Sequence, residues 1–269
     1  MSFSDIIQYI ILGIIQGATE PLPVSSSGHL RIVSYFFGVD VPDLHLEVFL
    51  NGASLLAVFI VYKTDLLVMV RETLNHVRKP TEKTAASFKL SMLIIVGTIP
   101  AVLAGGLLRD FIGGEMTHIH YVAVALIITG IALWLIRHLK GYKKDGDITY
   151  TDAVIVGIAQ AFALMPGISR SGATIVAALA RKIEAETALK FSFFLSIPVS
   201  IGSLVLESSV IVERVLSNDV LILYLIAFFV SLLVSVFAIK LLINVVTRGK
   251  LLYFALYCFS VAIIVLVLA

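Results

Sequence analysis

Residues 13–30 read GIIQGATEPLPVSSSGHL and residues 157–174 read GIAQAFALMPGISRSGAT, so two polar strings interrupt an otherwise apolar chain. The second string aligns with the first without a gap when it is shifted by 144 residues. The identical positions are Gly13 and Gly157, Ile14 and Ile158, Gln16 and Gln160, Ser25 and Ser169, Ser27 and Ser171, and Gly28 and Gly172. Paired interruptions of this kind, in corresponding halves of an apolar chain, predict a binding site at the interface of two repeats.

The composition predicts an integral membrane protein. Hydrophobic residues make up 59% of the 269-residue chain and charged residues 14%, whereas soluble domains have about 45–50% apolar and about 25% charged residues. The apolar runs are long and do not alternate with polar residues, which favours spanning helices over a membrane barrel. The net charge of +2 is too small to indicate a nucleic-acid partner. The start of the chain lacks a basic region and a small-residue cleavage site, so we expect no cleaved signal peptide.

Six apolar runs are long enough to cross about 30 Å of hydrocarbon, which takes roughly 20 residues. We expect membrane-crossing helices at about 46–63, 87–109, 119–138, 189–207, 219–241 and 251–268. Two further regions, about 4–37 and 149–183, are helical in pattern but broken by the polar strings. Their arms are too short to span, and irregular backbone at membrane depth is tolerated only against protein or a water-filled cavity. We therefore predict an all-α polytopic membrane protein with six transmembrane helices and two re-entrant helical hairpins.

The distribution of positive charge predicts the orientation. If the six runs span and both hairpins re-enter, only Arg31, Arg109 and Arg214 lie on one side and Arg170 lies in the second string; every other Lys and Arg falls on the opposite side. Positive residues mark the cytoplasmic side, so both termini should be outside.

One hairpin plus three spans is an odd number of crossings, which inverts the second half relative to the first. We therefore expect a single membrane domain, residues 1–269, made of an inverted repeat with halves at about 1–140 and 145–269. The hairpins would enter from opposite sides, so that their tips can meet inside the membrane.

The first string contains three kinds of candidate side chain. Glu20 is its only carboxylate, and an ionisable residue at membrane depth is costly and typically functional, although it could instead end a helix before Pro21. His29 could be a general acid, a base or a metal ligand, or a hydrogen-bonded packing residue. The serines at 25–27 offer donors, or a nucleophile if a neighbouring base activates one, and the alternative is that they cap the following helix.

The second string predicts an anion site. Its residues 166–174, PGISRSGAT, place serine and glycine before an apolar helical pattern, which offers N–H groups and hydroxyls at a helix N-terminus. Arg170 adds a planar guanidinium suited to two phosphate oxygens. The alternative is a structural pair between Arg170 and Glu20 that holds the two tips together. Both can be true, with the pair in the empty state and a phosphate in the bound state.

At these residues the chain resembles the bacterial undecaprenyl-diphosphate phosphatases of the bacitracin-resistance type. The motifs that carry the resemblance are QGATE at 16–20, PVSSSGH at 23–29 and PGISRSGAT at 166–174, with GTIPA at 97–101 and FSFFLSIP at 191–198 in support. The resemblance implies an enzyme of the bacterial cytoplasmic membrane that hydrolyses a polyprenyl diphosphate lipid to the monophosphate and releases phosphate at the outer face. It also implies recycling of the cell-wall lipid carrier and resistance to bacitracin.

The resemblance further implies roles for individual residues. A divalent cation, Mg²⁺ or Ca²⁺, would be held by Glu20, which could instead act in acid–base chemistry, with Gln16 as an additional ligand. Ser26 or His29 would attack or assist at the diphosphate. The residues that would bind its oxygens are Ser25, Ser27, Ser169, Arg170, Ser171 and Thr174. Two departures from the family pattern concern the pocket. Gln16 replaces a glutamate, although an amide oxygen can still coordinate. The string LNGAS at 50–54 replaces a more usual Q-L-G pattern, so we expect Asn51 to alter the wall of the pocket.

Two other classes of protein remain open on the sequence. A secondary transporter or lipid flippase also uses inverted repeats, broken helices and an anion site at the membrane midplane. Release of phosphate in detergent, where there are no two sides, would favour the enzyme. A structural subunit would instead lose stability and function together when Arg170 is changed to Ala. We also expect contact with membrane lipid and allow for a homodimer.

Overall fold

The computed structural model describes residues 2–38, 44–112, 118–217 and 220–269, without the side chains of residues 44, 108–112 and 214–217. Arg109 and Arg214, which the charge argument used, therefore have side chains outside the described set. Within the described residues the regular structure is helical, as predicted, apart from one isolated bridge between Lys143 and Ile183. The α-helices are α1 (Phe3–Thr19), α2 (Ser26–Phe37), α3 (Leu44–Val61), α4 (Lys63–Arg78), α5 (Glu82–Ile112), α6 (Ile119–Ile136), α7 (Tyr150–Phe162), α8 (Arg170–Ala180), α9 (Ala185–Ser217), α10 (Leu221–Thr247) and α11 (Leu252–Leu268).

The long apolar helices identify an integral membrane protein. In the described part of the chain, four helical segments are long and apolar enough to cross a membrane: Glu82–Leu107, Ile119–Ile136, Ala185–Glu213 and Leu221–Thr247. A fifth crossing results if α3 and α4 are counted together, although α4 bends from α3 by 80°. The predicted run at 251–268 forms α11, which has 17 residues and falls just short of that length. The sequence reasoning missed α4, because its charged residues hide its helical pattern from a search for apolar runs.

The two broken regions form the helix pairs α1–α2 and α7–α8. Two prolines at 21 and 23 follow the end of α1, and Gly167, with a φ of 87°, lies between α7 and α8. The returning helices are short, 12 residues for α2 and 11 for α8. At 1.5 Å per residue they reach about 16–18 Å, too little to cross the hydrocarbon.

Each of these pairs packs through a glycine on its first helix. A Cβ on Gly13 of α1 would lie 2.5 Å from the carbonyl oxygen of Ala227 on α10. A Cβ on Gly157 of α7 would lie 2.1 Å from the carbonyl oxygen of Gly97 on α5. Small residues let membrane helices approach this closely and gain dispersion contacts. The matched glycines of the two strings therefore have the same role, and each lies against a long helix from the other half of the chain.

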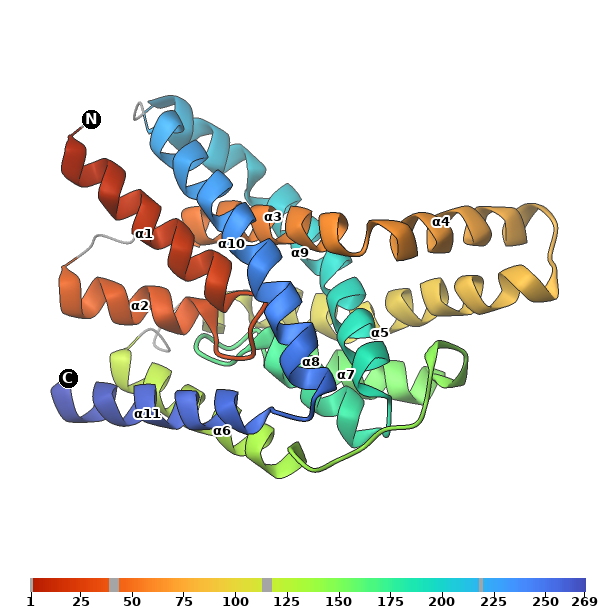
Figure 1. Ribbon diagram of the computed structural model, residues 1–269. Helices are drawn as coiled ribbons and strands as arrows, with labels where there is room; N and C mark the ends of the chain where they lie inside the picture. Colours follow the sequence, from red (N-terminus) through yellow and green to blue (C-terminus); the bar gives the residue numbers. More distant parts are fainter. Residues whose placement is uncertain (1, 39–43, 113–117, 218–219) are drawn as a thin grey trace.

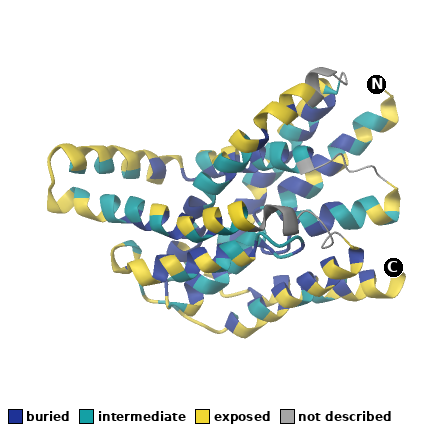
Figure 2. Ribbon diagram, turned by 180° about the vertical axis from the view of Figure 1, so that it is seen from behind, coloured by how far each residue is buried: buried dark blue, intermediate teal, exposed yellow. Residues whose placement is uncertain are grey.

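The remaining helices surround these contacts. Figure 1 shows α6 and α11 side by side and both termini at the same end of the molecule. Figure 2 shows exposed positions recurring along the outward faces of the helices, and these include large apolar side chains such as Leu107 and Phe237, 82% and 71% exposed. Exposed apolar surface on this scale is expected where a helix faces lipid.

Candidate functional site

The site lies where the turns of the two helix pairs meet. The hydroxyl of Ser171, at the start of α8, donates to the carbonyl oxygen of Leu22 in the turn after α1, at 3.0 Å. The backbone N–H of Gly167 donates to the Ser27 hydroxyl at 3.4 Å. A Cβ on Gly172 would lie 3.3 Å from the Pro23 side chain. The two polar strings are thus in direct contact, as their predicted arrangement requires.

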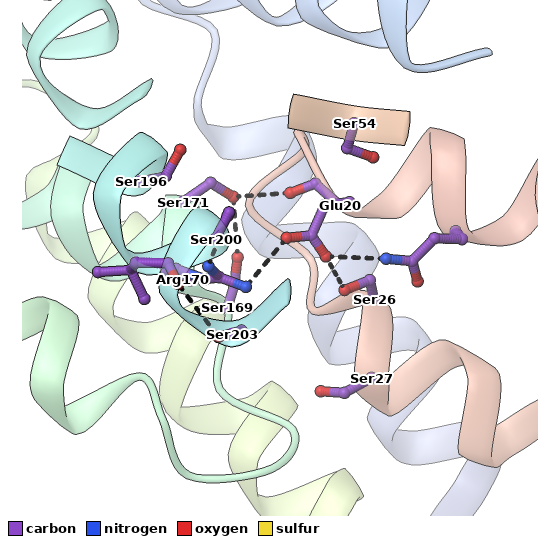
Figure 3. A network of polar contacts seen from close by, with 12 residues as sticks. Glu20, Ser26, Ser27, Ser54, Ser169, Arg170, Ser171, Ser196, Ser200 and Ser203 are labelled. Carbon is purple, nitrogen blue, oxygen red and sulfur yellow. Dashed lines mark hydrogen bonds and ion pairs between the residues drawn. The ribbon is translucent and has the colours of Figure 1, made fainter. Parts of the chain in front are cut away.

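Glu20 lies at the centre of this contact and links both strings (Figure 3). Its Oε1 atom accepts from Nη2 of Arg170 at 3.2 Å, which is the ion pair that the sequence allowed for. Its Oε2 atom accepts from the Ser26 hydroxyl and, at 3.2 Å, from Nε2 of Gln16. The side chains of Glu20 and Arg170 are only 15% and 23% exposed. One carboxylate therefore contacts a cation, a hydroxyl and an amide in a largely desolvated setting.

Asn51 on α3 joins the same pair. With its amide oriented to satisfy both neighbours, Nδ2 donates to Glu20 Oε1 at 3.2 Å and Oδ1 accepts from Arg170 Nη2 at 3.0 Å. The sequence suggested only that this position alters the wall of the pocket. Its contact with both charges could not be foreseen, because α3 lies outside both strings.

Two of the predicted phosphate-binding serines have a structural role. Ser25 caps α2 by accepting from the N–H of Gly28 at 3.2 Å, and Ser169 caps α8 by accepting from the N–H of Gly172 at 3.0 Å. The interpretation of the serines as helix caps is therefore confirmed for Ser25. Thr174 donates to the carbonyl oxygen of Arg170 at 3.0 Å, so its hydroxyl is also used within α8.

His29 lies beside the network rather than within it. Its Nδ1 lies 2.7 Å from the carbonyl oxygen of Ser25, which can only accept, so Nδ1 carries the proton. Its Nε2 lies 2.8 Å from the hydroxyl of Tyr257 on α11, and the two rings stack with centroids 5.6 Å apart. Both nitrogens are therefore occupied. Tyr257 was not predicted, since nothing in the apolar run around it marks the position.

A pocket opens at the Glu20–Arg170 pair and extends between α3 and α9. Its lining residues are Glu20, Pro21, Asn51, Ser54, Leu55, Val58, Arg170, Ser171, Thr174, Ile175, Ser192, Phe193, Ser196 and Ser200. Arg170 also contacts the Ser200 hydroxyl through Nη1 at 3.4 Å. The pocket therefore combines one guanidinium, one carboxylate and a set of hydroxyls with apolar walls, an arrangement suited to a phosphate group attached to an apolar molecule.

The oxygen donors of the site fit a divalent cation in part. No group of three or more His, Cys, Asp and Glu side chains suited to a metal occurs among the described residues. Gln16 is fully buried, and its Oε1 atom has no hydrogen-bond partner there. Mg²⁺ is commonly held by one or two carboxylates together with substrate phosphates. Glu20 and Gln16 fit that type of site, with most of the ligands left to substrate and water.

The second helix pair is anchored at the end away from the site. Asp152, fully buried at the start of α7, accepts from Lys143 at 2.9 Å and from Arg181 at 2.7 Å. Burial alone would raise the pKa of this carboxyl, but hydrogen bonds from Lys143, Thr149 and Arg181 outweigh it and hold the pKa below its usual value. Asp152 therefore stays ionised and ties the connection before α7 to the end of α8.

Known proteins are similar to this chain over nearly its whole length. The family model described as "Bacitracin resistance protein BacA" matches residues 9–264. A protein named undecaprenyl-diphosphatase 1 from Halalkalibacterium halodurans is 49% identical over 261 residues, which cover 97% of this chain and 95% of the relative. A protein of the same name from Bacillus licheniformis is 44% identical over 270 residues, and each chain is covered completely. Taken with the two strings and the site that they form, these matches show that the chain belongs to the bacitracin resistance protein BacA family.

Proposed function

We propose that this chain is a membrane phosphatase that hydrolyses undecaprenyl diphosphate to undecaprenyl phosphate and phosphate. Relatives that it matches from end to end are named for this activity. The observation that carries the proposal is the double engagement of Glu20, with Arg170 on one oxygen and Ser26 on the other. A base, a hydroxyl and a phosphate-binding cation are thereby joined in one network. In the bacterium, this activity recycles the cell-wall lipid carrier and confers bacitracin resistance.

The geometry supports a separate role in the reaction for each of these residues. The diphosphate displaces Glu20 from Arg170, whose guanidinium then binds phosphate oxygens. Ser26 attacks the terminal phosphorus while its proton passes to Glu20, and the anhydride bond breaks so that the lipid monophosphate leaves with the bridging oxygen. Water then cleaves the phosphoserine, which returns the hydroxyl to Ser26 and releases phosphate, and the proton on Glu20 passes to a departing phosphate oxygen.

His29 has a supporting role in this scheme. It follows Ser26 by three residues and thus lies about one turn further along α2. Its contacts with Ser25 and Tyr257 hold the first turn of that helix in place. Ser26 is favoured over His29 as the nucleophile because its hydroxyl, unlike the ring nitrogens, is bonded to the carboxylate.

The proposed activity includes a divalent cation, Mg²⁺ or Ca²⁺. Glu20 and the unpartnered Oε1 of Gln16 would hold it together with oxygens of the diphosphate. The cation would neutralise charge that develops on the phosphate groups. Ser27 and Ser171 would supply further hydroxyls to the diphosphate, whereas Ser25, Ser169 and Thr174 contribute mainly by shaping the two helix starts.

The proposed placement in the membrane is six crossings with two re-entrant hairpins in an inverted repeat. The equivalent packing of Gly13 and Gly157 on opposite long helices and the contact between the two turns support it. Both termini and the opening of the site would then lie at the outer face of the bacterial cytoplasmic membrane. Each terminus can be tested with a thiol reagent that does not cross the membrane, applied to single cysteines introduced at residue 2 and residue 269.

Purified protein in detergent tests the reaction. Given undecaprenyl diphosphate and Mg²⁺ or Ca²⁺, it should release phosphate and form the monophosphate in equal amounts, and a chelator should stop both. Ser26→Ala should remove the activity while leaving the thermal stability close to that of the parent. Absence of phosphate release with either metal would contradict the proposal and favour a transporter or flippase.

A further inference from the structure

The pocket behind the Glu20–Arg170 pair contains more hydroxyl groups than the proposed chemistry uses. Ser192, Ser196 and Ser200 recur every four residues on α9, so they lie on one face of that helix, and all three line the pocket. Ser54 on α3 lines it as well, and Figure 3 shows Ser54, Ser196 and Ser200 around the ion pair. None of these serines belongs to the two polar strings.

Ser192 is the serine of this set whose hydroxyl indicates a bound ligand. The residue is 5% exposed, and its hydroxyl has no hydrogen-bond partner within the described part of the chain. An unpaired buried hydroxyl costs free energy, and such groups usually mark a ligand, an ion or an ordered water. Ser196, one turn away, satisfies its hydroxyl on the carbonyl oxygen of Phe193 at 2.7 Å and can still accept or exchange partners.

The shape of the pocket limits what can enter. Gly52 on α3 faces Leu204 on α9, whereas Tyr62 just beyond α3 packs on Phe193 and Phe194 at 5.8 and 5.7 Å between ring centroids. The two helices therefore run in opposite directions, and the pocket leads from Arg170 toward these aromatic rings. Phe193 lines the pocket at that end and is itself packed on Tyr62, so a compact group fits there better than one that carries a lipid chain.

We propose that this pocket is a phosphate subsite for the end of the diphosphate that carries no lipid. It would receive the terminal phosphoryl group before cleavage and inorganic phosphate after it, with the hydroxyls of Ser192 and Ser196 as neutral donors and Arg170 at the mouth. The apolar walls at Leu55, Val58 and Ile175 exclude water and strengthen the attraction to Arg170. This subsite rests on the proposed phosphatase activity, because only a diphosphate substrate supplies a terminal phosphoryl group.

Product inhibition measures the subsite directly. Formation of the lipid monophosphate is followed by chromatography while inorganic phosphate is added, for the parent and for a Ser192→Ala/Ser196→Ala double variant. Loss of two hydrogen bonds to a charged group should raise the inhibition constant of phosphate by about tenfold or more. The KM for the lipid diphosphate should rise with it, since the same hydroxyls bind the terminal group in the substrate.

Ser208→Ala is the matched control. Ser208 is an exposed residue of the same helix and donates to the carbonyl oxygen three residues before it, at 2.8 Å, as Ser196 does, but it does not line the pocket. It should leave both constants unchanged. If the double variant proves unstable, Ser196→Ala alone should still raise the inhibition constant.

The outcomes separate the two proposals. An active parent whose phosphate inhibition is the same in the parent, the double variant and Ser196→Ala overturns the subsite and leaves the phosphatase intact. A parent that forms no monophosphate overturns the phosphatase itself. A change in turnover without a change in phosphate inhibition also overturns the subsite, because the serines would then act on the pocket wall rather than on the phosphate.

Discussion

The turns of the two helix pairs start their returning helices in the same way but carry different reactive and charged side chains. In both, a serine caps the returning helix by accepting from a glycine N–H three residues later, Ser25 in α2 and Ser169 in α8. At the next position the first turn has Ser26 and the second has Arg170. The carboxylate of Glu20 has Leu164 as its counterpart. The comparison teaches that the two strings supply two helix starts that face each other, while differences at a few positions place the proposed nucleophile and base in one turn and the proposed phosphate-binding cation in the other.

The two pairs also differ at their far ends. Each opens with a capping box, Ser2 with Asp5 in α1 and Thr149 with Asp152 in α7. Asp5 is only partly buried, whereas Asp152 is fully buried between Lys143 and Arg181. The pair that contributes Arg170 is therefore anchored by charge, and the pair that contributes Glu20 is held mainly by apolar packing and by the contact of α1 with α10.

The largest effect on activity should follow from removing either charged side chain of the Glu20–Arg170 pair. Arg170→Ala and Glu20→Ala should each lower kcat/KM by about 100-fold or more, the scale measured for removal of one preorganised transition-state partner. The thermal unfolding midpoint of each variant in detergent should stay near that of the parent. A collapse in stability that matches the loss of activity would instead support a purely structural pair.

The next largest effect, on the free energy of unfolding, is expected at the start of α7, where Asp152 is buried. Asp152→Asn should destabilise the fold by about 3 kcal/mol, because it leaves the cations of a buried ion pair without a carboxylate. Asp5→Asn at the corresponding, less buried cap should cost less, because solvent screens that carboxylate. Unfolding in denaturant measures both, and equal losses would remove the asymmetry between the two ends.

Acid should weaken the same anchor. The pKa of Asp152 is lower in the folded than in the unfolded chain, so its contribution to stability is present above a pH of about 4 and is lost as the pH falls further. The free energy of unfolding should therefore fall less steeply with acid in Asp152→Asn than in the parent. Parallel pH dependences for the two proteins would show that Asp152 is not the group responsible.

Substitution of Gly13 or Gly157 should destabilise the fold by a similar amount if the two glycines pack in equivalent positions. Gly13→Ala and Gly157→Ala push a methyl group into a backbone carbonyl and should each cost about 1–3 kcal/mol. Gly202→Ala on α9, where nothing lies within 4 Å of the added carbon, should be neutral or stabilise by up to about 1 kcal/mol. A harmless Gly157→Ala would separate the two crossings and weaken the case for equivalent packing.

The smallest effect should distinguish the two cap serines. Ser25 has a φ of 67°, a conformation that favours glycine, whereas Ser169 has a φ of −72°. Ser169→Gly should therefore cost a few tenths of a kcal/mol, and Ser25→Gly should cost nothing or stabilise slightly. Comparison of the two unfolding midpoints checks this, and a larger loss at residue 25 would contradict the backbone argument.

Much of the site followed from the two strings, and the reasons that some of it did not are physical. Glu20, Ser26 and Arg170 were expected because ionisable and hydroxyl groups inside apolar sequence are costly and stand out. Ser200 and Tyr257 were not recognised as site residues, and Asn51 was expected only in the wall of the pocket, because a single polar group in an apolar helix carries no sign of what it faces. The helix α4 was missed because it carries many charged residues, and a charged amphipathic helix does not appear in a search for apolar runs.

The sequence by itself determined that the chain is helical and lies in a membrane, because a helix satisfies its own backbone hydrogen bonds and the long apolar runs lack the alternation of barrel strands. It also determined that two broken helical segments carry serine, glutamate and arginine inside apolar sequence, since their spacing and their interruptions are local properties. Only the tertiary structure decided which oxygen of Glu20 meets Arg170 and which meets Ser26, that His29 turns to Tyr257, and that serines of α9 extend the pocket. Those facts depend on how separate helices pack against one another, and packing is set by contacts between residues far apart in the chain.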